Sequence, residues 1–169
     1  SYPMLHKERL INADLAGGAL LDVGVYALTF ADMFKSSSVD DIHAVALMTK
    51  EGVDAHDSIT IRYQDGSMAV LNTSMETVGD RKGIIQGTEG VIVIENINNF
   101  ESIAVYDKDY KRKLFKKAPK QITGYEYEIE ACKKALKWHK KECPEMSHAD
   151  TMIIMKQMDH IRKEIGLKY

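Results

Sequence analysis

The first strong pattern along the chain is an apolar stretch between Gly17 and Phe34. Its apolar residues surround the helix axis instead of forming one stripe, which predicts a helix packed on several sides. Gly24 costs a helix interior about 1 kcal/mol relative to alanine, so it indicates close approach by another backbone or a ligand. The polar residues 1–12 predict an irregular or partly helical entry, and the serines after Lys35 end the helix.

The middle of the chain changes to a period of two, which is typical of strands. Ile59, Ile61 and Tyr63 alternate with polar residues, and Asp65-Gly66 predicts a turn into a returning strand. The same alternation predicts strands over residues 42–48, 68–75, 82–86, 91–95, 102–106 and 111–115. Six or seven consecutive strands favour an open, mainly antiparallel β-sheet.

Apolar spacing returns to the helical period in the last third of the chain. A helix from Tyr125 to His139 has one apolar face, which we expect to pack on the sheet. Ser147 and Asp150 have the spacing of a capping box, and an apolar stripe continues to Gly166, the predicted C-terminal cap. This order of elements predicts a single α+β domain over residues 1–169, with helices packed on one face of the sheet.

Composition narrows the class of partner. The 169 residues are 44% hydrophobic and 28% charged, enough to bury a core without disulfides or a metal. The net charge of -2 gives no basic field for nucleic acid or an anionic membrane, so we expect a small molecule or another protein as partner. The apolar run over residues 15–31 is too short for a spanning helix and is predicted to be buried.

Two cysteines, Cys132 and Cys143, have no metal-ligand spacing. They predict free thiols in a reducing compartment, and we expect a cytoplasmic protein. The chain begins at Ser1 instead of methionine, which is consistent with a processed or excised fragment.

Familiar binding motifs are missing from the sequence. Gly17-Gly18 and the turn over residues 87–90 do not complete the glycine fingerprint of a dinucleotide site, and no P-loop occurs. The six histidines never fall at the spacing of a ligand pair, so no metal site is predicted. Basic residues gathered over 111–120 predict a solvated strand and loop.

One acid and one phenol lie close together in the first predicted helix. Asp22 and Tyr26 are four residues apart, so their side chains share one helix face. An isolated carboxylate among apolar neighbours costs several kcal/mol unless it is paired or protonated. From the residues alone, Asp22 is either a structural acid bonded to backbone or a nearby arginine, or a catalytic acid.

Several segments together resemble the C-terminal domain of the Gfo/Idh/MocA oxidoreductases: A-G-G-A-L-L-D-V-G-V-Y, G-T-E-G-V-I-V-I, G-Y-E-Y-E-I-E-A-C, E-C-P-E-M and M-D-H-I-R-K-E-I-G-L-K-Y. The resemblance covers residues 9–169 and is greatest to the trans-dihydrodiol and D-xylose dehydrogenase branch. It implies a glyceraldehyde-3-phosphate dehydrogenase-like C-terminal domain from a two-domain enzyme, whose N-terminal Rossmann domain binds NAD or NADP and is absent from this chain.

The resemblance also implies roles for individual residues. Tyr26 would exchange a proton with the hydroxyl or carbonyl of a sugar, polyol or dihydrodiol, and Asp22 would orient the site or tune its proton affinity. Arg9 and Tyr125 would lie on the substrate side, with ordinary packing or a surface ion pair as the alternative for each. Gly17 and Gly18 would approach the nicotinamide. The open sheet face would pair with another copy to form a homo-oligomer.

The family's E-K-P lysine and its glycine-rich loop do not occur in these 169 residues, so the fragment alone is expected to be inactive. Two other readings remain. A non-catalytic binding or scaffold domain of the same fold is the main alternative. A stand-alone hydrolase using Asp22 lacks a second positioned carboxylate or a nucleophile with its base.

Overall fold

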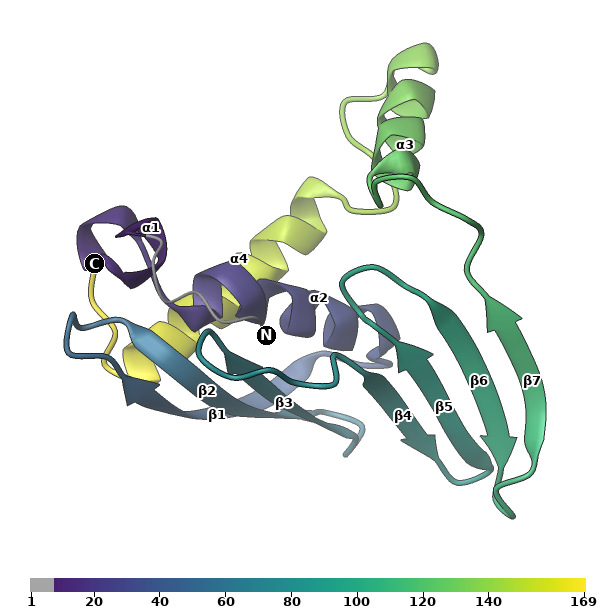
Figure 1. Ribbon diagram of the computed structural model, residues 1–169, viewed down its shortest axis with the longest axis horizontal. Helices are drawn as coiled ribbons and strands as arrows, with labels where there is room; N and C mark the ends of the chain where they lie inside the picture. The colour runs from purple at the N-terminus through teal and green to yellow at the C-terminus, as the bar shows by residue number, and fades with distance from the viewer. Residues whose placement is uncertain (1–7) are drawn as a thin grey trace. The chain divides into compact units, whose positions relative to one another are not determined.

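The computed structural model describes residues 8–169 and divides them into two compact units (Figure 1). The first unit comprises residues 8–80 with 154–169, and the second comprises residues 81–153. The predicted single domain therefore contains two compact parts. Of the predicted entry over residues 1–12, the first seven lie outside the described residues, and the rest includes the short helix α1, Glu8–Ile11.

The first unit is built on a three-stranded antiparallel sheet in the order β1-β2-β3. These strands are Val39–Met48, Asp54–Tyr63 and Met68–Ser74. The predicted alternation holds in β2, since Ile59, Ile61 and Tyr63 are buried while Ser58 and Arg62 are exposed. The Asp65-Gly66 turn joins β2 to β3 as predicted.

Two helices cover the apolar face of this sheet (Figure 1). They are α2, Val25–Phe34, and α4, His148–Glu164, whose last eleven residues belong to the first unit. The buried cluster that joins the helices to the strands consists of Leu20, Leu28, Ile42, Ala44, Ile59, Ile61, Tyr63, Ile154, Met158 and Ile161. The predicted ends of α4 are confirmed, because Ser147 Oγ and Asp150 Oδ2 cap each other's N–H groups and Gly166 follows the helix with φ +74°.

The start of the first long helix differs from the prediction. The 3-10 turn η1, Ala13–Leu15, is followed by Gly17 and Gly18 outside any helix, and helical backbone begins with the π-helical turn η2, Leu20–Gly24. Gly18 has φ +121°, a conformation that cannot continue a right-handed helix. The predicted start at Gly17 is therefore three residues too early.

The prediction that the apolar run over residues 15–31 is too short to span a membrane is wrong by length and composition, because the segment Ala13–Phe34 is long enough and has a mean hydropathy of 1.3. Within it, Leu20 and Leu28 are fully buried in the cluster described above. This packing agrees with the prediction of a buried helix.

The second unit holds a four-stranded antiparallel sheet in the order β4-β5-β6-β7. Its strands are Gly83–Gly87, Gly90–Glu95, Ser102–Asp107 and Arg112–Lys117. The predicted α+β class with seven antiparallel strands is confirmed, and the strands form two hydrogen-bonded sheets because β3 and β4 do not pair.

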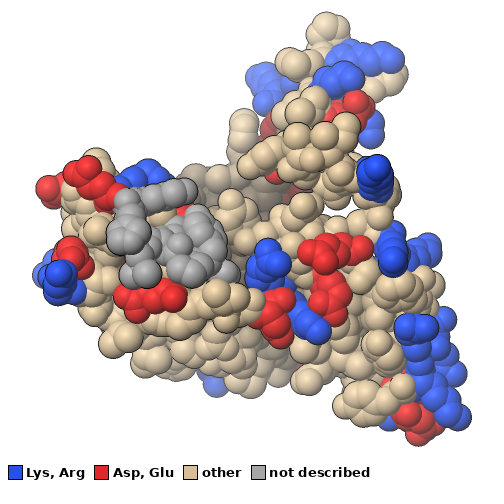
Figure 2. All heavy atoms as spheres, in the orientation of Figure 1, with Lys and Arg blue, Asp and Glu red and all other residues tan. Residues whose placement is uncertain are grey.

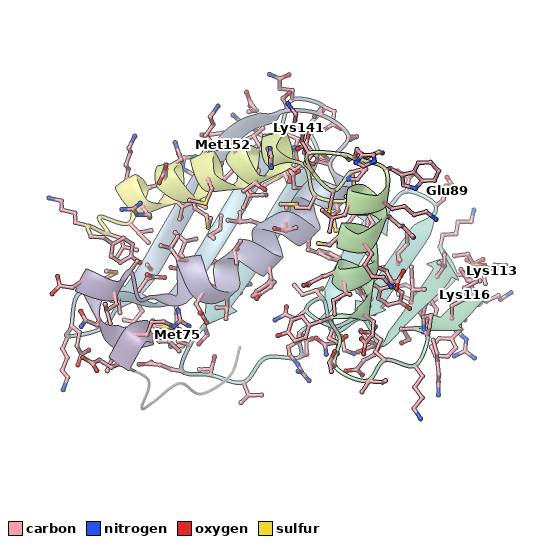
Figure 3. All side chains as sticks on the ribbon, turned by 90° about the horizontal axis from the view of Figure 1, so that it is seen from above. Met75, Glu89, Lys113, Lys116, Lys141 and Met152 are labelled. Atoms are coloured by element: carbon pink, nitrogen blue, oxygen red, sulfur yellow. The ribbon has the colours of Figure 1, made fainter. Side chains whose placement is uncertain are left out.

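Strand β7 carries the predicted basic residues on a fully exposed strand. Lys113 and Lys116 point outward from it (Figure 3), and blue side chains gather along this edge of the second unit in Figure 2. Lys113 Nζ lies 2.9 Å from Asp107 Oδ2 on the neighbouring strand. The prediction of a solvated strand agrees with this exposure.

Helix α3, Glu126–Lys137, begins one residue after its predicted start. Glu126 accepts hydrogen bonds from the N–H groups of Ile122, Thr123 and Gly124, and these bonds hold its pKa at about 2. The expected packing of the apolar face is not observed, because Tyr125, Ile129 and Leu136 are more than half exposed. Cys132 and Cys143 are free thiols with their sulfur atoms 3.9 Å apart.

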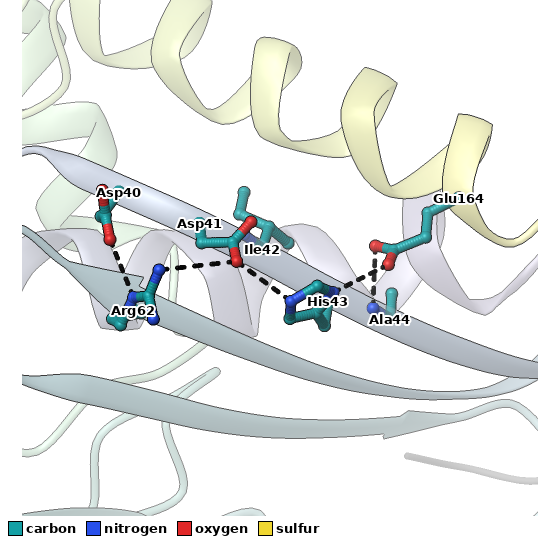
Figure 4. A network of polar contacts seen from close by, with 7 residues as sticks. All are labelled: Asp40, Asp41, Ile42, His43, Ala44, Arg62 and Glu164. Carbon is teal, nitrogen blue, oxygen red and sulfur yellow. Dashed lines mark hydrogen bonds and ion pairs between the residues drawn. The ribbon is translucent and has the colours of Figure 1, made fainter.

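A polar network ties the end of α4 to β1 (Figure 4). Glu164 accepts from the N–H of Ala44 at 2.9 Å and lies 3.2 Å from His43 Nδ1, while Asp41 lies 3.0 Å from His43 Nε2. Arg62 continues the network to Asp40 at 2.8 Å. The hydrogen bond that His43 donates to Glu164 and the charge of Asp41 raise the pKa of His43, which favours its protonated form.

Candidate active site

The candidate site lies where η2 continues into α2. Asp22 is in the π-helical turn, whose backbone is identified by the bond from the N–H of Val25 to the carbonyl of Leu20 five residues earlier. Tyr26 follows in the first turn of α2 and is 50% exposed. Single π turns inside helices occur often at functional sites. An accessible phenol therefore follows the acid by four residues, on an unusual turn of backbone.

Asp22 is paired with a cation from a separate element. Arg9 Nη2, from α1, lies 2.8 Å from Asp22 Oδ1, and the Asp22 side chain is 17% exposed. Of the two readings of Asp22 drawn from the residues, its pairing with an arginine is observed. The ion pair does not exclude a role in catalysis, because a paired carboxylate also orients neighbouring groups. The substrate roles of Arg9 and Tyr125 stay predictions, and Tyr125 belongs to the second unit.

The two glycines before η2 are explained by contacts within the chain. A Cβ on Gly17 would lie 2.6 Å from the carbonyl oxygen of Leu10, and one on Gly18 would lie 2.1 Å from Asp54 Oδ1. The N–H of Gly18 donates to the Leu10 carbonyl at 2.9 Å. Gly17 and Gly18 thus lie close to Leu10 and Asp54 of the same chain. Their approach to nicotinamide stays a prediction.

Asp54 at the start of β2 accepts the N–H of Leu20 at 2.5 Å, so its carboxylate lies at the N-terminus of the helix that carries Asp22 and Tyr26. Asp54 is fully buried and Asp57 is 3% exposed. Thr73 Oγ1 donates to Asp57 Oδ2 at 2.7 Å. No ion pair of the described residues includes either acid.

Burial raises the pKa of both acids. For Asp57, burial and the charge of Asp54 raise the pKa to about 7, against the bond from Thr73. For Asp54, hydrogen bonds from backbone N–H groups, first that of Leu20, and the interaction with Asp57 offset part of the rise. Sequence reasoning missed this pair, although a signal was present: Asp57 has the same strand parity as Ile59 and Ile61 and so points into the core.

Tyr169 lies beside Gly17 and the buried acid Asp54. The hydroxyl of Tyr169 donates to the carbonyl of Gly17, and the Arg162 guanidinium lies 4.8 Å from the centre of the Tyr169 ring. Burial and the nearby charge of Asp54 raise the pKa of Tyr169 to about 12. The Tyr169 phenol therefore stays protonated and remains a donor at neutral pH.

The Gly17-Gly18 step does not fit the phosphates of a dinucleotide. Phosphate cradles need free backbone N–H groups beside glycines, whereas here the N–H of Gly18 is bonded to Leu10 and the space beside both glycines is filled. The described residues also hold no cluster of three or more metal-ligating side chains. Proton transfer by Tyr26 and orientation by Asp22 and Arg9 stay predictions.

Comparison with known protein families decides the assignment. A model described as the GFO/IDH/MocA C-terminal domain matches residues 2–93, more than half of the chain. The chain belongs to this family. The GFO/IDH/MocA match includes Arg9, Gly17, Gly18, Asp22 and Tyr26.

Relatives of this GFO/IDH/MocA domain include named dehydrogenases. A trans-1,2-dihydrobenzene-1,2-diol dehydrogenase from Xenopus tropicalis is 30% identical over 95% of this chain and 51% of its own length. A scyllo-inositol 2-dehydrogenase (NADP(+)) from Bacillus subtilis is 27% identical over 99% of this chain and 51% of its own length. The chain spans about half the length of the curated relatives it matches.

Solved structures confirm the GFO/IDH/MocA fold. An aldose-aldose oxidoreductase from Caulobacter crescentus, complexed with glycerol, matches with a TM-score of 0.80 at 16% identity, covering 96% of this chain and 50% of the other. A 3-ketoreductase from Actinomadura kijaniata, in complex with NADP and TDP-benzene, matches with a TM-score of 0.80 at 20% identity over the same shares.

Proposed function

We propose that this chain is the substrate-binding and assembly half of an NAD(P)-dependent oxidoreductase acting on a sugar, polyol or dihydrodiol. The observation that carries the proposal is the accessible Tyr26 phenol one helical turn after the Arg9–Asp22 ion pair. The activities named for the relatives, a dihydrodiol and an inositol dehydrogenase, support the same substrate class.

Each residue of the site has a separate part in this proposal. Tyr26 exchanges a proton with the substrate oxygen, since its hydroxyl is a donor and acceptor on an exposed side chain. Asp22 holds Arg9 in place at 2.8 Å, and the pair orients substrate hydroxyls beside the phenol. Hydride chemistry is supplied by the nicotinamide cofactor when it is bound.

The cofactor is held by residues outside this chain in our proposal. The filled space beside Gly17 and Gly18 supports this division, and so does the chain's coverage of half of each relative. A nucleotide-binding domain preceding these residues would supply the phosphate site and the missing cation for Tyr26. We also propose a cytoplasmic location, where the cofactor and reduced thiols coexist.

The experiment is to compare the 169-residue chain with the protein encoded by its complete reading frame. Both are assayed with NAD+ and NADP+ against a panel of sugars, polyols and dihydrodiols, and reduced nicotinamide is followed by absorbance. We expect turnover only from the complete protein. Turnover by the 169-residue chain alone, or sugar binding by the complete protein without any nicotinamide reduction, would reject the proposal, and the second result would favour the scaffold alternative.

The outer face of the first sheet is proposed to pair with a second copy. It presents exposed apolar side chains on β1 and β3, namely Val45, Leu47, Met68 and Val70. An antiparallel sheet with helices on one face leaves such a face uncovered. Light scattering after size exclusion should give a dimer or larger assembly, and Val45→Lys with Val70→Lys should give a monomer. Val78→Lys, at an exposed loop position, is the control, and a monomeric parent chain would contradict the expectation.

A further inference from the structure

Two buried acids beside the candidate site have no basic partner among the described residues. Asp54 and Asp57 are the acidic residues that the described part of the chain buries almost completely, and the Oδ1 atom of each has no hydrogen-bond partner among the described residues. A buried, unpaired carboxylate is costly, so a fold that keeps two of them adjacent needs a reason.

We propose that Asp54 is a positioning residue, which fixes the helix bearing Asp22 and Tyr26, and that Asp57 carries the shared proton that lets Asp54 stay charged in the core. The part of this proposal that concerns turnover rests on the proposed function. The part that concerns the shared proton does not.

The negative charge belongs on Asp54 because of what surrounds it. Its Oδ2 accepts the Leu20 N–H at 2.5 Å, and a backbone bond from Ala19 also favours its charged form. These N–H groups lie at the N-terminus of the helix and have no partner within it. The helix dipole favours an anion at this position. Among the described residues, Asp57 accepts a hydrogen bond only from the Thr73 hydroxyl.

The proton belongs on Asp57 because Asp57 has fewer donors to stabilise a negative charge than Asp54 has. The interaction between the two side chains lowers the pKa of Asp54 and raises that of Asp57, as expected when Asp57 is the protonated member of the pair. The other titratable groups facing the pair are the Tyr169 phenol, bonded to Gly17, and Arg162 of α4, which lies against the Tyr169 ring. Neither is bonded to Asp54 or Asp57 among the described contacts.

Gly18 shows that this position is built for a carboxylate. The backbone at Gly18 approaches Asp54 so closely that no side chain fits between them, and Tyr169 Oη would lie 3.2 Å from a Cβ there. The Gly-Gly step, Asp54 and the terminal tyrosine therefore form one arrangement around the start of the helix. Displacing the carboxylate would shift the backbone that leads directly into Asp22.

The shared proton predicts a particular dependence of stability on pH. The pKa of Asp57 is about 7 in the folded chain and near 3.8 ordinarily, so the folded state binds more protons between these values. The contribution of Asp57 to stability is therefore greatest below about pH 4, falls as the pH rises toward 7, and is constant above about pH 7. Asp57→Asn mimics the protonated acid and should remove this decrease of stability with rising pH.

The first test is urea unfolding of the 169-residue chain from about pH 4 to pH 9, with Asp57→Asn, Asp54→Asn and the exposed Asp14→Asn as control. Relative to the parent, the folding constant of Asp57→Asn should rise by up to roughly tenfold per pH unit between about pH 4 and 7. At about pH 8, Asp54→Asn should fold with a constant roughly five- to tenfold smaller than that of Asp57→Asn, because it loses the charged helix cap. Asp14→Asn should follow the parent.

An infrared readout separates protonation from simple packing. The parent chain at about pH 6 should show the carbonyl band of a protonated carboxylic acid, and Asp57→Asn should lack it. In the complete protein, Asp54→Asn should lower kcat more than it raises KM, and Asp57→Asn should leave kcat close to that of the parent.

The outcomes distinguish this inference from the proposed function. If Asp57→Asn keeps the parent's pH dependence and infrared band, or if Asp54→Asn folds as stably as Asp57→Asn, the acid-pair inference is wrong. If the unfolding and infrared results hold while the complete protein transfers no hydride, the proposed function fails and the acid pair stands. A kcat unchanged by Asp54→Asn in an active complete protein would overturn the positioning role.

Discussion

Replacing Gly18 with alanine is expected to lower the free energy of unfolding by about 3 kcal/mol or more. The new Cβ would meet Asp54 Oδ1 at 2.1 Å, and the backbone at φ +121° is one that side chains rarely adopt. Relief of the clash requires Asp54 to move away from the Leu20 N–H. The buried carboxylate then loses this hydrogen bond, which destabilises the folded state. Urea unfolding of the 169-residue chain measures the change.

Gly52→Ala is the matched control for this prediction. Gly52 also has a positive φ, +84°, but a Cβ there would meet no atom within 4 Å. It should cost about 1 kcal/mol through backbone strain alone. Equal losses from the two substitutions would mean that the contact with Asp54 contributes nothing to the cost at Gly18.

Replacing Tyr26 with phenylalanine is expected to lower kcat of the complete protein by roughly 10²- to 10⁴-fold, the usual contribution of a positioned proton donor. The ring remains, so substrate contacts made by its carbon atoms are kept and KM should change little. Because the Tyr26 side chain is half exposed, the variant should unfold at the same urea concentration as the parent. Steady-state kinetics with the best substrate of the panel measures the effect.

Tyr110→Phe provides the control for loss of a phenol, since Tyr110 is 81% exposed and lies in the second unit. It should retain the parent's kcat. If Tyr26→Phe also kept full kcat under conditions where the chemical step limits the rate, Tyr26 would not be the proton donor. A loss confined to KM would instead assign Tyr26 to substrate binding.

Local patterns predicted most of the strands, because each hairpin is determined by residues close together in sequence. The Asp65-Gly66 turn and the alternation of Ile59, Ile61 and Tyr63 are examples, and both occur as predicted. The capping pair of Ser147 and Asp150 is another short-range interaction that the structure contains. Interactions of this range require no knowledge of how distant segments meet.

The features that sequence reasoning missed depend on distant contacts. The helix starts at Leu20 instead of Gly17 because Asp54, thirty-four residues away, takes the Leu20 N–H. The division into two sheets depends on whether β3 and β4 pair, which no local pattern specifies. The exposed face of α3 has the same spacing as a buried one, so periodicity alone could not distinguish them.

The candidate site was predicted in part for the same reason. Asp22 and Tyr26 follow each other within one helix, so their shared position could be inferred from spacing. The alternation of β2 already places Asp57 on the core side of the strand, but its pairing with Asp54 behind the helix required coordinates. The least predictable part of the site is thus the one that holds the helix in place.

Strand β7 has a consequence for how the molecule behaves in concentrated solution. It ends the second sheet, and four of its six exposed residues are basic, namely Arg112, Lys113, Lys116 and Lys117. An identical strand approaching this edge would place cations against cations, which opposes fibril growth by edge-to-edge addition. Lysine acetylation or molar salt would weaken that repulsion, so storage buffers of low ionic strength should keep preparations clear for longer.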